Sequence, residues 1–509
     1  SANAGVNLAE RRADYWNFGG IFRPVFIVAK PAQNIDRLAI DAKADGNFYA
    51  DCFLNMAVEG ARIHTVITDV KGKKVAENTS DVRTGSDHAS INFTVKSPEL
   101  WTAETPTMYQ ATFTLLDKAG KTLHVENQKF GFRTIETRES DGLYINGQRV
   151  MIKGVNRHSF RPESGRTLSK AKNIEDVLLI KSMNMNAVRL SHYPADPEFF
   201  EACDSLGLYV MDELSGWHGK HETINGQKLV KEMITRDVNH PCIIWWSNGN
   251  EKGWNTELDG EFHKYDPQKR PVLHPQGNFS GYETMHYRSY GESQNYMRLP
   301  EIFMPTEFLH GLYDGGHGAG LYDYWEMMRK HPRCAGGFLW VLTETDIAQC
   351  EVLLSKAMTY GAKRVALLAK EDVYGQTFID WFAFQAKEFG LEVAGIVSYT
   401  DATVGDGFRQ CADYDADFMI CVPSSVENLQ DMVATRKGIP GLVSRQLYSD
   451  VAFSATVLDR LGKDAEGLEG IAMSPDPVSG FQVSYEVKFG DQPVLGEAHM
   501  YDALCLIAY

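Results

Sequence analysis

Between about residue 140 and residue 342, short apolar segments alternate with stretches of helical pattern, and this alternation narrows the possible folds most. Eight apolar segments occur in this region, namely VMIKGVN, AVRLSH, LYVMDE, CIIWWSN, PVLHPQ, TMHYRS, IFMPTEF and GFLWVL. In the intervening stretch KNIEDVLLIKSMN, apolar residues recur at the spacing of an amphipathic helix. Eight repeats of one strand–helix unit predict a parallel (β/α)8 TIM barrel rather than an open doubly wound sheet.

Different patterns flank this repeat. Residues 34–135 contain short segments of alternating apolar and polar residues, separated by turn formers such as VKGKK, which is typical of an immunoglobulin-like β-sandwich. After residue 342, segments such as RVALLA and DFMICV alternate with helical ones, which predicts an α/β lobe with a five-stranded parallel sheet. We therefore expect domains at 34–135, 136–343 and 344–509. Residues 1–33, aromatic and Gly-rich, resemble the end of a domain and are too few to fold alone.

Composition argues against several classes of function. The formal net charge of -16, without a local cluster of Lys and Arg, argues against a nucleic-acid partner. No run of about 18 apolar residues occurs, so no membrane span is predicted. The eight cysteines form no C-x-x-C pair and lie mostly in apolar segments, which indicates buried free thiols. The chain opens without a basic and apolar leader, so the compartment stays open, with periplasmic or extracellular favoured if a leader was removed.

Two glutamates end strongly apolar strands of the predicted barrel. Glu251 follows the fourth strand in WWSNGNE, and Glu307 ends the seventh in MPTEF. The carboxyl ends of barrel strands form the active-site face, so both side chains are expected at the mouth. Breaking a glycosidic bond requires two carboxyl groups, one that holds a proton through a raised pKa and one that is ionised. The pair predicts a glycoside hydrolase, against the alternative of glutamates that merely close strands at the surface.

Further polar and aromatic residues end the other predicted strands. Asn250 directly precedes the first glutamate and can donate a hydrogen bond to a sugar hydroxyl beside the anomeric carbon. Taken singly, the others fit satisfied polar residues or, for the tryptophan, a core residue. Taken jointly, they predict a ring of donors and acceptors with an indole platform, as a sugar pocket requires. They are His158, His192, Asp212, Glu213, Tyr287 and Trp340.

No cofactor and no metal site are predicted. The sequence has no H-E-x-x-H motif, no G-x-S-x-G turn and no P-loop, and His158 with His192 is a weak metal-ligating pair. The DGGHGAG stretch at 314–320 fits a loop at the rim better than a phosphate-binding one.

The order of these motifs resembles glycoside hydrolase family 2, the β-galactosidase family, over residues 1 to about 342. DGLYINGQRVMIKGVNRHSF, NAVRLSHYP, SNGNE and PTEF occur in the family's order, and DYWNFGGIFRPV looks like the end of its jelly-roll sugar-binding domain. The resemblance implies a retaining exo-β-glycosidase with Glu251 as acid/base and Glu307 as nucleophile. Asn248 replaces the leucine of the family's usual S-L-G-N-E, and β-galactosides are the leading substrate class. The pocket residues that the resemblance implies are Asp14, Asn250, His192, Tyr287 and Trp340.

Residues 344–509 resemble another family, the type 1 periplasmic substrate-binding proteins of the branched-chain amino-acid type. The resemblance rests on GAKRVALLAKEDVYGQTFIDWFAFQAKEFGLEV and EAHMYDALCLIAY. It implies a second-ligand site at Tyr374, against the equal alternative of a packing residue at a helix start. Because two partial families meet in one chain, we predict a junction of two partial sequences near residues 342–346.

The barrel has no evident eighth helix of its own. We expect DIAQCEVLLSKAMTYG to take that place, with Leu353 and Leu354 against strands one and eight. Two alternatives to an active glycosidase stay open: a binding protein for a small, amino-acid-like solute, and a catalytically impaired composite of both parts. The sugar, the aglycone and the oligomeric state are not indicated by the sequence.

Overall fold

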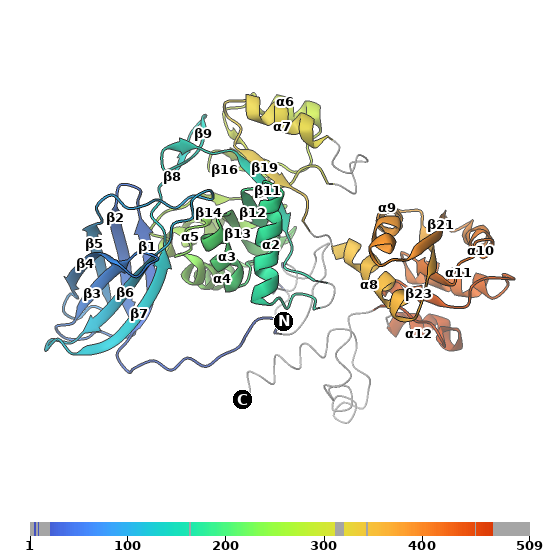
Figure 1. Cartoon of the computed structure of the whole chain (residues 1–509), viewed down its shortest axis with the longest axis horizontal. Helices are drawn as coiled ribbons and strands as arrows, with labels where there is room; N and C mark the ends of the chain where they lie inside the picture. Colours follow the sequence, from blue (N-terminus) through green and yellow to red (C-terminus); the bar gives the residue numbers. More distant parts are fainter. Residues whose placement is uncertain are drawn as a thin grey trace. The chain divides into compact units, whose positions relative to one another are not determined.

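The computed structural model describes residues 5, 6, 9, 21–161, 164–310, 320–342, 345–452 and 455–471. The chain divides into two compact units (Figure 1). The first consists mainly of residues 25–159 and 169–342, and the second mainly of the described residues from 345 onward. Among the helices that are described, none combines the length and the apolar character that crossing a membrane requires.

A sandwich of two antiparallel sheets begins the first unit, as predicted (Figure 1). Every second residue of β2 is buried, because successive side chains of a strand point to opposite faces. The inward side chains, such as Phe48, Ile63 and Phe113, form one apolar core. The strands are β1 Ile35–Ala42, β2 Asn47–Leu54 and β5 His88–Thr94 in one sheet, and β4 Lys74–Asp81, β3 Arg62–Thr68, β6 Tyr109–Leu116 and β7 Thr122–Phe130 in the other.

A curled parallel sheet follows, after a small antiparallel sheet of β8 Ile135–Arg138, β9 Gly142–Ile145 and β10 Gln148–Arg149. Six strands are hydrogen-bonded in the order β15-β14-β13-β12-β11-β19. β17 and β18 pair in parallel, and β18 reaches the chain just before β19 through a bridge from Phe303 to Cys334. These strands are β11 Ile152–Arg157, β12 Ala187–Leu190, β13 Tyr209–Trp217, β14 Ile243–Asn250, β15 Val272–Leu273, β17 Tyr282–Glu283, β18 Ile302–Phe303 and β19 Gly336–Leu339.

The predicted TIM-barrel architecture is confirmed at this level, with one error of register. The sixth strand is β17, and the predicted segment TMHYRS is the non-strand chain that follows it. Helices alternate with the strands, except that residues 274–281 hold the short β16 Asn278–Phe279 where a helix would stand. The helices are α2 Lys170–Ser182, α3 Pro197–Leu206, α4 Thr223–Asp237, η1 Thr256–Leu258, α5 Asp259–Tyr265, α6 Tyr290–Tyr296 and α7 Leu321–Lys330.

The second unit is a three-layer α/β arrangement. Its four parallel strands lie in the order β21-β20-β22-β23, with one apolar core on each face of the sheet. Of the fifth predicted strand, only a bridge from Gly470 to Tyr448 falls within the described residues. The elements are α8 Thr345–Thr359, β20 Arg364–Lys370, α9 Val373–Glu388, β21 Glu392–Tyr399, α10 Val404–Ala412, β22 Phe418–Val422, α11 Val426–Arg436, β23 Gln446–Tyr448, η2 Asp450–Ala452, α12 Ala455–Leu461 and η3 Gly462–Ala465.

The prediction that the helix at 345–359 serves as the barrel's eighth helix is wrong. Leu353 and Leu354 are fully buried in the core of the second unit, together with Leu367, Phe378 and Ile420. The apolar face of α8 is therefore buried on the sheet of the second unit.

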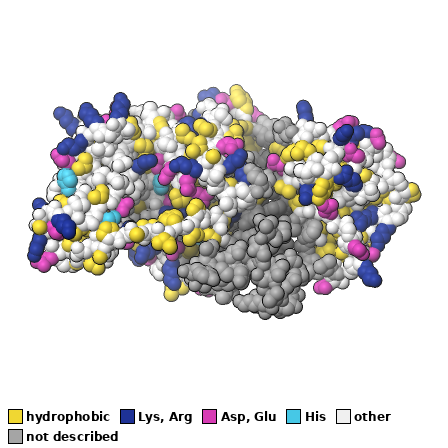
Figure 2. All heavy atoms as spheres, turned by 60° about the horizontal axis from the view of Figure 1, so that its bottom comes forward, with side chains coloured by type: hydrophobic (Ala, Val, Ile, Leu, Met, Phe, Trp, Pro, Cys, Tyr) yellow, Lys and Arg dark blue, Asp and Glu magenta, His cyan; other side chains and the backbone are white. Residues whose placement is uncertain are grey.

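The surface charges are mixed and the described cysteine thiols are buried. Figure 2 shows acidic and basic side chains intermixed on the face that it draws. Seven cysteines lie within the described residues, and all are buried and free, as predicted. Burial raises the pKa of the Cys203 and Cys242 thiols well above the usual value, which keeps them protonated and unreactive.

Candidate active site

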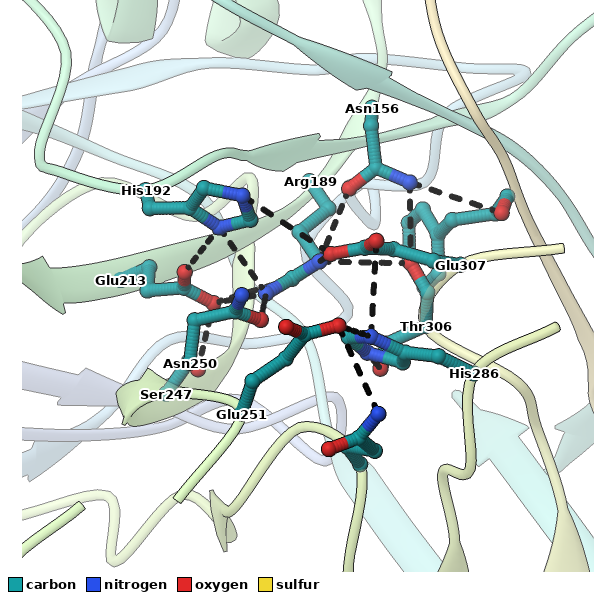
Figure 3. Close-up of polar contacts among 12 residues, drawn as sticks. Asn156, Arg189, His192, Glu213, Ser247, Asn250, Glu251, His286, Thr306 and Glu307 are labelled. Atoms are coloured by element: carbon teal, nitrogen blue, oxygen red, sulfur yellow. Dashed lines mark hydrogen bonds and ion pairs between the residues drawn. The ribbon is translucent and has the colours of Figure 1, made fainter. Parts of the chain in front are cut away.

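Glu251 and Glu307 lie at the carboxyl ends of two strands of the curled sheet. Glu251 directly follows β14, and Glu307 comes four residues after β18. One oxygen of each carboxylate and one ring nitrogen of His286 all lie within 4.8 Å of one another (Figure 3). Glu307 is buried, whereas 14% of the Glu251 side chain is exposed. The two glutamates singled out in the sequence are therefore neighbours, and one of them is open to solvent.

The guanidinium of Arg189, on β12, joins the groups around Glu307. It donates to Glu307 Oε1 at 2.6 Å and to Glu213 Oε2 at 2.7 Å. It also donates to Asn250 Oδ1 at 2.7 Å and to Asn156 Oδ1 at 3.1 Å. Burial disfavours the charge, but the two carboxylates more than offset this and raise the pKa of Arg189 above its ordinary value. Glu307 is therefore held beside a permanent cation.

Asn250, the last residue of β14, has a fixed orientation. Its Oδ1 accepts the hydrogen bond from Arg189, so the amide nitrogen must point the other way. This nitrogen is buried and finds no partner among the described protein atoms. A buried donor left unpaired costs about 1–3 kcal/mol, so the amide is arranged for a hydrogen bond to a ligand.

Three of the predicted pocket residues form an aromatic cluster. The rings of His192 and Trp340 stack with centroids 5.4 Å apart, and His158 meets both rings edge-on. One face of Trp340 is thus covered by His192, which leaves less of the indole free than an open platform would have. His192 Nδ1 lies 2.8 Å from Glu213 Oε1, and its Nε2 lies 3.8 Å from Glu307 Oε1. Burial lowers the pKa of His192 to about 3, so this imidazole is neutral near pH 7.

Tyr287 holds the other oxygen of Glu307. Its hydroxyl donates to Glu307 Oε2 at 2.5 Å, and its backbone N–H donates to the Glu307 carbonyl at 3.1 Å. Each oxygen of this carboxylate therefore has its own donor, Arg189 on Oε1 and Tyr287 on Oε2. These two contacts fix the direction of the carboxylate.

Glu251 is surrounded by two histidines. His286 Nδ1 lies 2.9 Å from Glu251 Oε1, and His218 Nε2 lies 3.1 Å from Oε2. Burial alone would raise the pKa of Glu251, but the hydrogen bond and charge of His286, aided by His218, lower it below the ordinary value. This direction is opposite to the raised pKa that a glycosidase acid needs, because His286 competes with Glu251 for the proton.

Two further predicted site residues lie outside the described part of the first unit. Asp14 lies outside the described residues. Tyr374 lies in the first turn of α9 in the second unit, where its ring is 5.3 Å from that of Phe378 and packs on an apolar core.

Sequence reasoning missed Arg189 and His286. Arg189 interrupts the apolar strand AVRL, and a charge inside a buried strand is the signal that was available. The sequence offers no comparable signal for His286, which lies in the segment TMHYRS that is predicted to be a strand.

Among the described residues, one group of potential metal ligands is closely spaced, and it consists of Glu251, His286 and Glu307. Arg189 lies 2.6 Å from Glu307 and places a fixed positive charge at this group, which opposes a cation. We therefore assign no metal to it.

Comparison with known proteins relates most of the chain to one enzyme family. A model described as glycosyl hydrolases family 2, TIM barrel domain, matches residues 135–365, and a model of glycosyl hydrolases family 2 matches residues 33–133. The β-galactosidase of Halalkalibacterium halodurans is 33% identical over 372 residues, covering 64% of this chain and 35% of that protein. The β-galactosidase of Pseudoalteromonas haloplanktis is 33% identical over 384 residues, covering 66% and 36%. The chain thus spans about a third of the length of these relatives.

Solved structures show the same fold. A glycosyl hydrolase family 2 member from Bacteroides cellulosilyticus has a TM-score of 0.52 and 23% identity, over 61% of this chain and 44% of that one. A Bacteroides uniformis β-glucuronidase has a TM-score of 0.58 and 20% identity, over 72% of this chain and 57% of that one.

Proposed function

Residues 33–365 belong to glycosyl hydrolase family 2, and on this premise we propose that the chain is a retaining exo-β-glycosidase acting on terminal β-galactosides. The relatives at 33% identity are named β-galactosidases, which favours this sugar. The match covers about a third of their length. Support for this activity therefore has to come from the site residues of this chain.

The observation that carries the proposal is the spacing of two carboxylates at the barrel mouth. Oxygens of Glu251 and Glu307 lie within 4.8 Å of each other. Retaining glycosidases hold their carboxyl groups about 5–5.5 Å apart, whereas inverting enzymes need about 6.5–9.5 Å to admit a water molecule. The shorter spacing supports direct attack by one carboxylate.

The contacts suit different roles for the two groups. Glu307 is buried and held through both oxygens, which fixes its direction as a nucleophile requires. Glu251 is partly exposed and bound to histidines, so it can exchange a proton with the departing group and with water. The unpaired amide of Asn250 fits the hydroxyl next to the anomeric carbon, where a hydrogen bond strengthens in the transition state.

Glu307→Gln tests the nucleophile. With 4-nitrophenyl β-galactoside, we expect kcat/KM to fall by about 10⁴-fold or more, because the amide cannot form the glycosyl ester. The same assay with 4-nitrophenyl β-glucuronide tests the substrate class, and faster turnover of the glucuronide would reject the galactoside assignment.

Glu201→Gln is the matched control. Glu201 lies on the surface of α3, where it pairs with Lys170 at 3.2 Å, so the same chemical change there should leave kcat/KM unaltered. If Glu307→Gln kept wild-type activity while folding normally, the assigned nucleophile would be wrong.

We further propose finer assignments for the rest of the chain. The sandwich is immunoglobulin-like, with domains at 34–135, 136–343 and 344–509, and Asp14, His192, Tyr287, Trp340 and His158 line the sugar pocket. The family match runs past residue 343, the proposed end of the barrel. The likeness of 344–509 to periplasmic substrate-binding proteins, with a ligand site at Tyr374, stays a prediction. Calorimetric titration with amino acids tests it, but the family match does not favour solute binding as the function.

A further inference from the structure

A chain of three hydrogen bonds passes from Glu251 through His286 into the protein. His286 Nδ1 lies 2.9 Å from Glu251 Oε1, and His286 Nε2 lies 2.9 Å from Thr306 Oγ1. Thr306 Oγ1 in turn donates to the carbonyl of Thr284 at 3.0 Å. The His286 side chain is completely buried, and Figure 3 shows it beside Glu251 and Thr306.

This chain fixes which nitrogen of His286 carries a proton. A hydroxyl has one proton to donate, and Thr306 gives it to the buried carbonyl of Thr284. The Thr306 oxygen must then accept from His286, so Nε2 is protonated. In a neutral imidazole of this tautomer, Nδ1 bears a lone pair and faces Glu251 Oε1 at hydrogen-bond distance.

A lone pair and a carboxylate oxygen repel each other at 2.9 Å unless a proton lies between them. Resting on the function proposed above, we propose that His286 and Glu251 share one proton, between Nδ1 and Oε1, and that His286 is the positioning residue that stores the acid/base proton. The lowered pKa of Glu251 agrees with this contact, because the hydrogen bond from His286 favours the carboxylate.

Several charged and titratable groups face the His286–Glu251 pair. Glu307 Oε2 lies 3.4 Å from Nδ1 and is a second anion beside it. His192 is neutral, since burial lowers its pKa to about 3. The groups that face the pair are Glu251, Glu307, Glu213, His192, His218 and Arg189.

The proton that the pair gives up in the first step of the reaction is returned in the second. In the first step, Glu307 bonds to the anomeric carbon, the bond to the aglycone breaks, and the proton passes from the pair through Glu251 to the aglycone oxygen. Glu251 is then a carboxylate opposite a lone pair, which makes it a stronger base. In the second step, water attacks the anomeric carbon, the ester to Glu307 breaks, and a proton of that water returns to the pair.

His286→Gln keeps a hydrogen-bonding side chain but removes the second site for the proton. We measure kcat/KM against pH with aryl β-galactosides whose phenols differ in acidity. Two sites bind a shared proton more tightly than one, so the alkaline limb of the profile should move down by about one pH unit or more. The loss should reach about 10²-fold for a weakly acidic phenol but stay within a few-fold for a dinitrophenol, which leaves without acid assistance.

Thr306 offers a second, milder variant. Thr306→Val removes the acceptor of the Nε2 proton and should shift the limb in the same direction, whereas Thr306→Ser should restore the wild-type profile. A purely structural role for His286 predicts equal losses for all phenols and an unmoved limb, and that result would overturn the proposal.

Two measurements keep the inference separate from the proposed function. If Glu251→Gln retained full activity on the weakly acidic phenol, the proposed acid/base would be wrong. If Glu251→Gln lost that activity while His286→Gln left the pH profile unmoved, only the shared proton would be wrong. In wild-type protein, ¹⁵N NMR should show His286 protonated at Nε2 on the alkaline side of the limb, and a neutral Nδ1–H form there would overturn the inference without any variant.

Discussion

Arg189 determines the geometry of the site at the scale of single residues. Its guanidinium contacts two buried carboxylates and two amide oxygens, and its own side chain is fully buried. A guanidinium offers five N–H donors in a fixed planar fork, whereas an ammonium offers three and cannot reproduce all of these contacts. Arg189 therefore aims Glu307 and leaves the donor of Asn250 free for substrate.

Arg189→Lys is expected to keep the charge and lose this geometry. We predict a fall in kcat/KM of about 10²-fold or more, because Glu307 and Asn250 lose their common support. We also predict a loss of about 1–3 kcal/mol in the free energy of unfolding, since buried acceptors lose their donors. Aryl-glycoside kinetics and urea unfolding measure the two effects. Arg138→Lys, at an exposed pair with Glu136, is the control and should change neither. A wild-type result for Arg189→Lys would show that charge alone suffices.

Residues differ in how far the sequence predicts them. Glu251 and Glu307 were predictable because each ends a strongly apolar segment, and position at the end of a barrel strand implies the mouth. The partners of Arg189 lie 24 residues away at Glu213 and 118 residues away at Glu307, so no local pattern connects them. The competition between Glu251 and His286 for a proton likewise depends on tertiary packing, so the sequence does not show the direction of the Glu251 pKa shift.

At the scale of elements, short strands limited the prediction most. β15, β17 and β18 have two residues each. The chain on either side of them is irregular, although its apolar and polar residues stand where those of a longer strand would. The eightfold alternation predicts the correct number of strands. It places the sixth strand at TMHYRS, however, whereas β17 ends at Glu283, just before that segment. Two ladder residues are too few to impose a period of two on the sequence.

Glu283, on β17, makes the stability of this region depend on pH. Burial raises its pKa to about 7, against an ordinary value of 4.5, although Arg288 opposes the shift. The folded state thus binds the proton more tightly than the unfolded state, so ionisation of Glu283 lowers stability as pH rises from 4.5 to about 7. One of its oxygens, Oε2, is buried without a hydrogen-bond partner, which agrees with this cost.

Glu283→Gln should remove this penalty. We expect the variant to match the wild type in unfolding free energy near pH 4.5 and to exceed it by about 2 kcal/mol at pH 8. Urea unfolding at a series of pH values gives the difference directly, and Glu201→Gln, at the exposed pair on α3, provides a flat control. A difference that does not change with pH would mean that Glu283 is ionised in the folded protein throughout.

At the scale of the whole molecule, the chain contains separate apolar cores. The sandwich and the curled sheet have their own cores, and the second unit has two more, one on each face of its sheet. The sequence predicted this division from the change of pattern near residue 342. It did not predict where α8 belongs, because an amphipathic helix at a boundary carries no information about which of two sheets it covers.

The predicted junction near residues 342–346 has a direct test. Intact-mass measurement with peptide mapping should fail to find one peptide that covers LWVLTETDIAQCE if two partial sequences were merely concatenated. Recovery of that single peptide would show that the chain is continuous. Concatenation would then be wrong, and only a fusion of two partial proteins would remain.

Separate cores predict that the two units lose their structure in separate transitions. Phe382, on α9, is fully buried in the core that also holds Leu353 and Leu354. Phe382→Ala should cost about 3–5 kcal/mol there, because the cavity removes buried contacts. In the full chain, calorimetry should show one transition moving to lower temperature and another unchanged, and kcat/KM for the aryl galactoside should stay at the wild-type value. Val230→Ala on α4, in the core around the curled sheet, should move the other transition instead. If either substitution shifted both transitions together and also lowered activity, the two units would fold as one cooperative body, and the glycosidase site would depend on the α/β lobe that follows it.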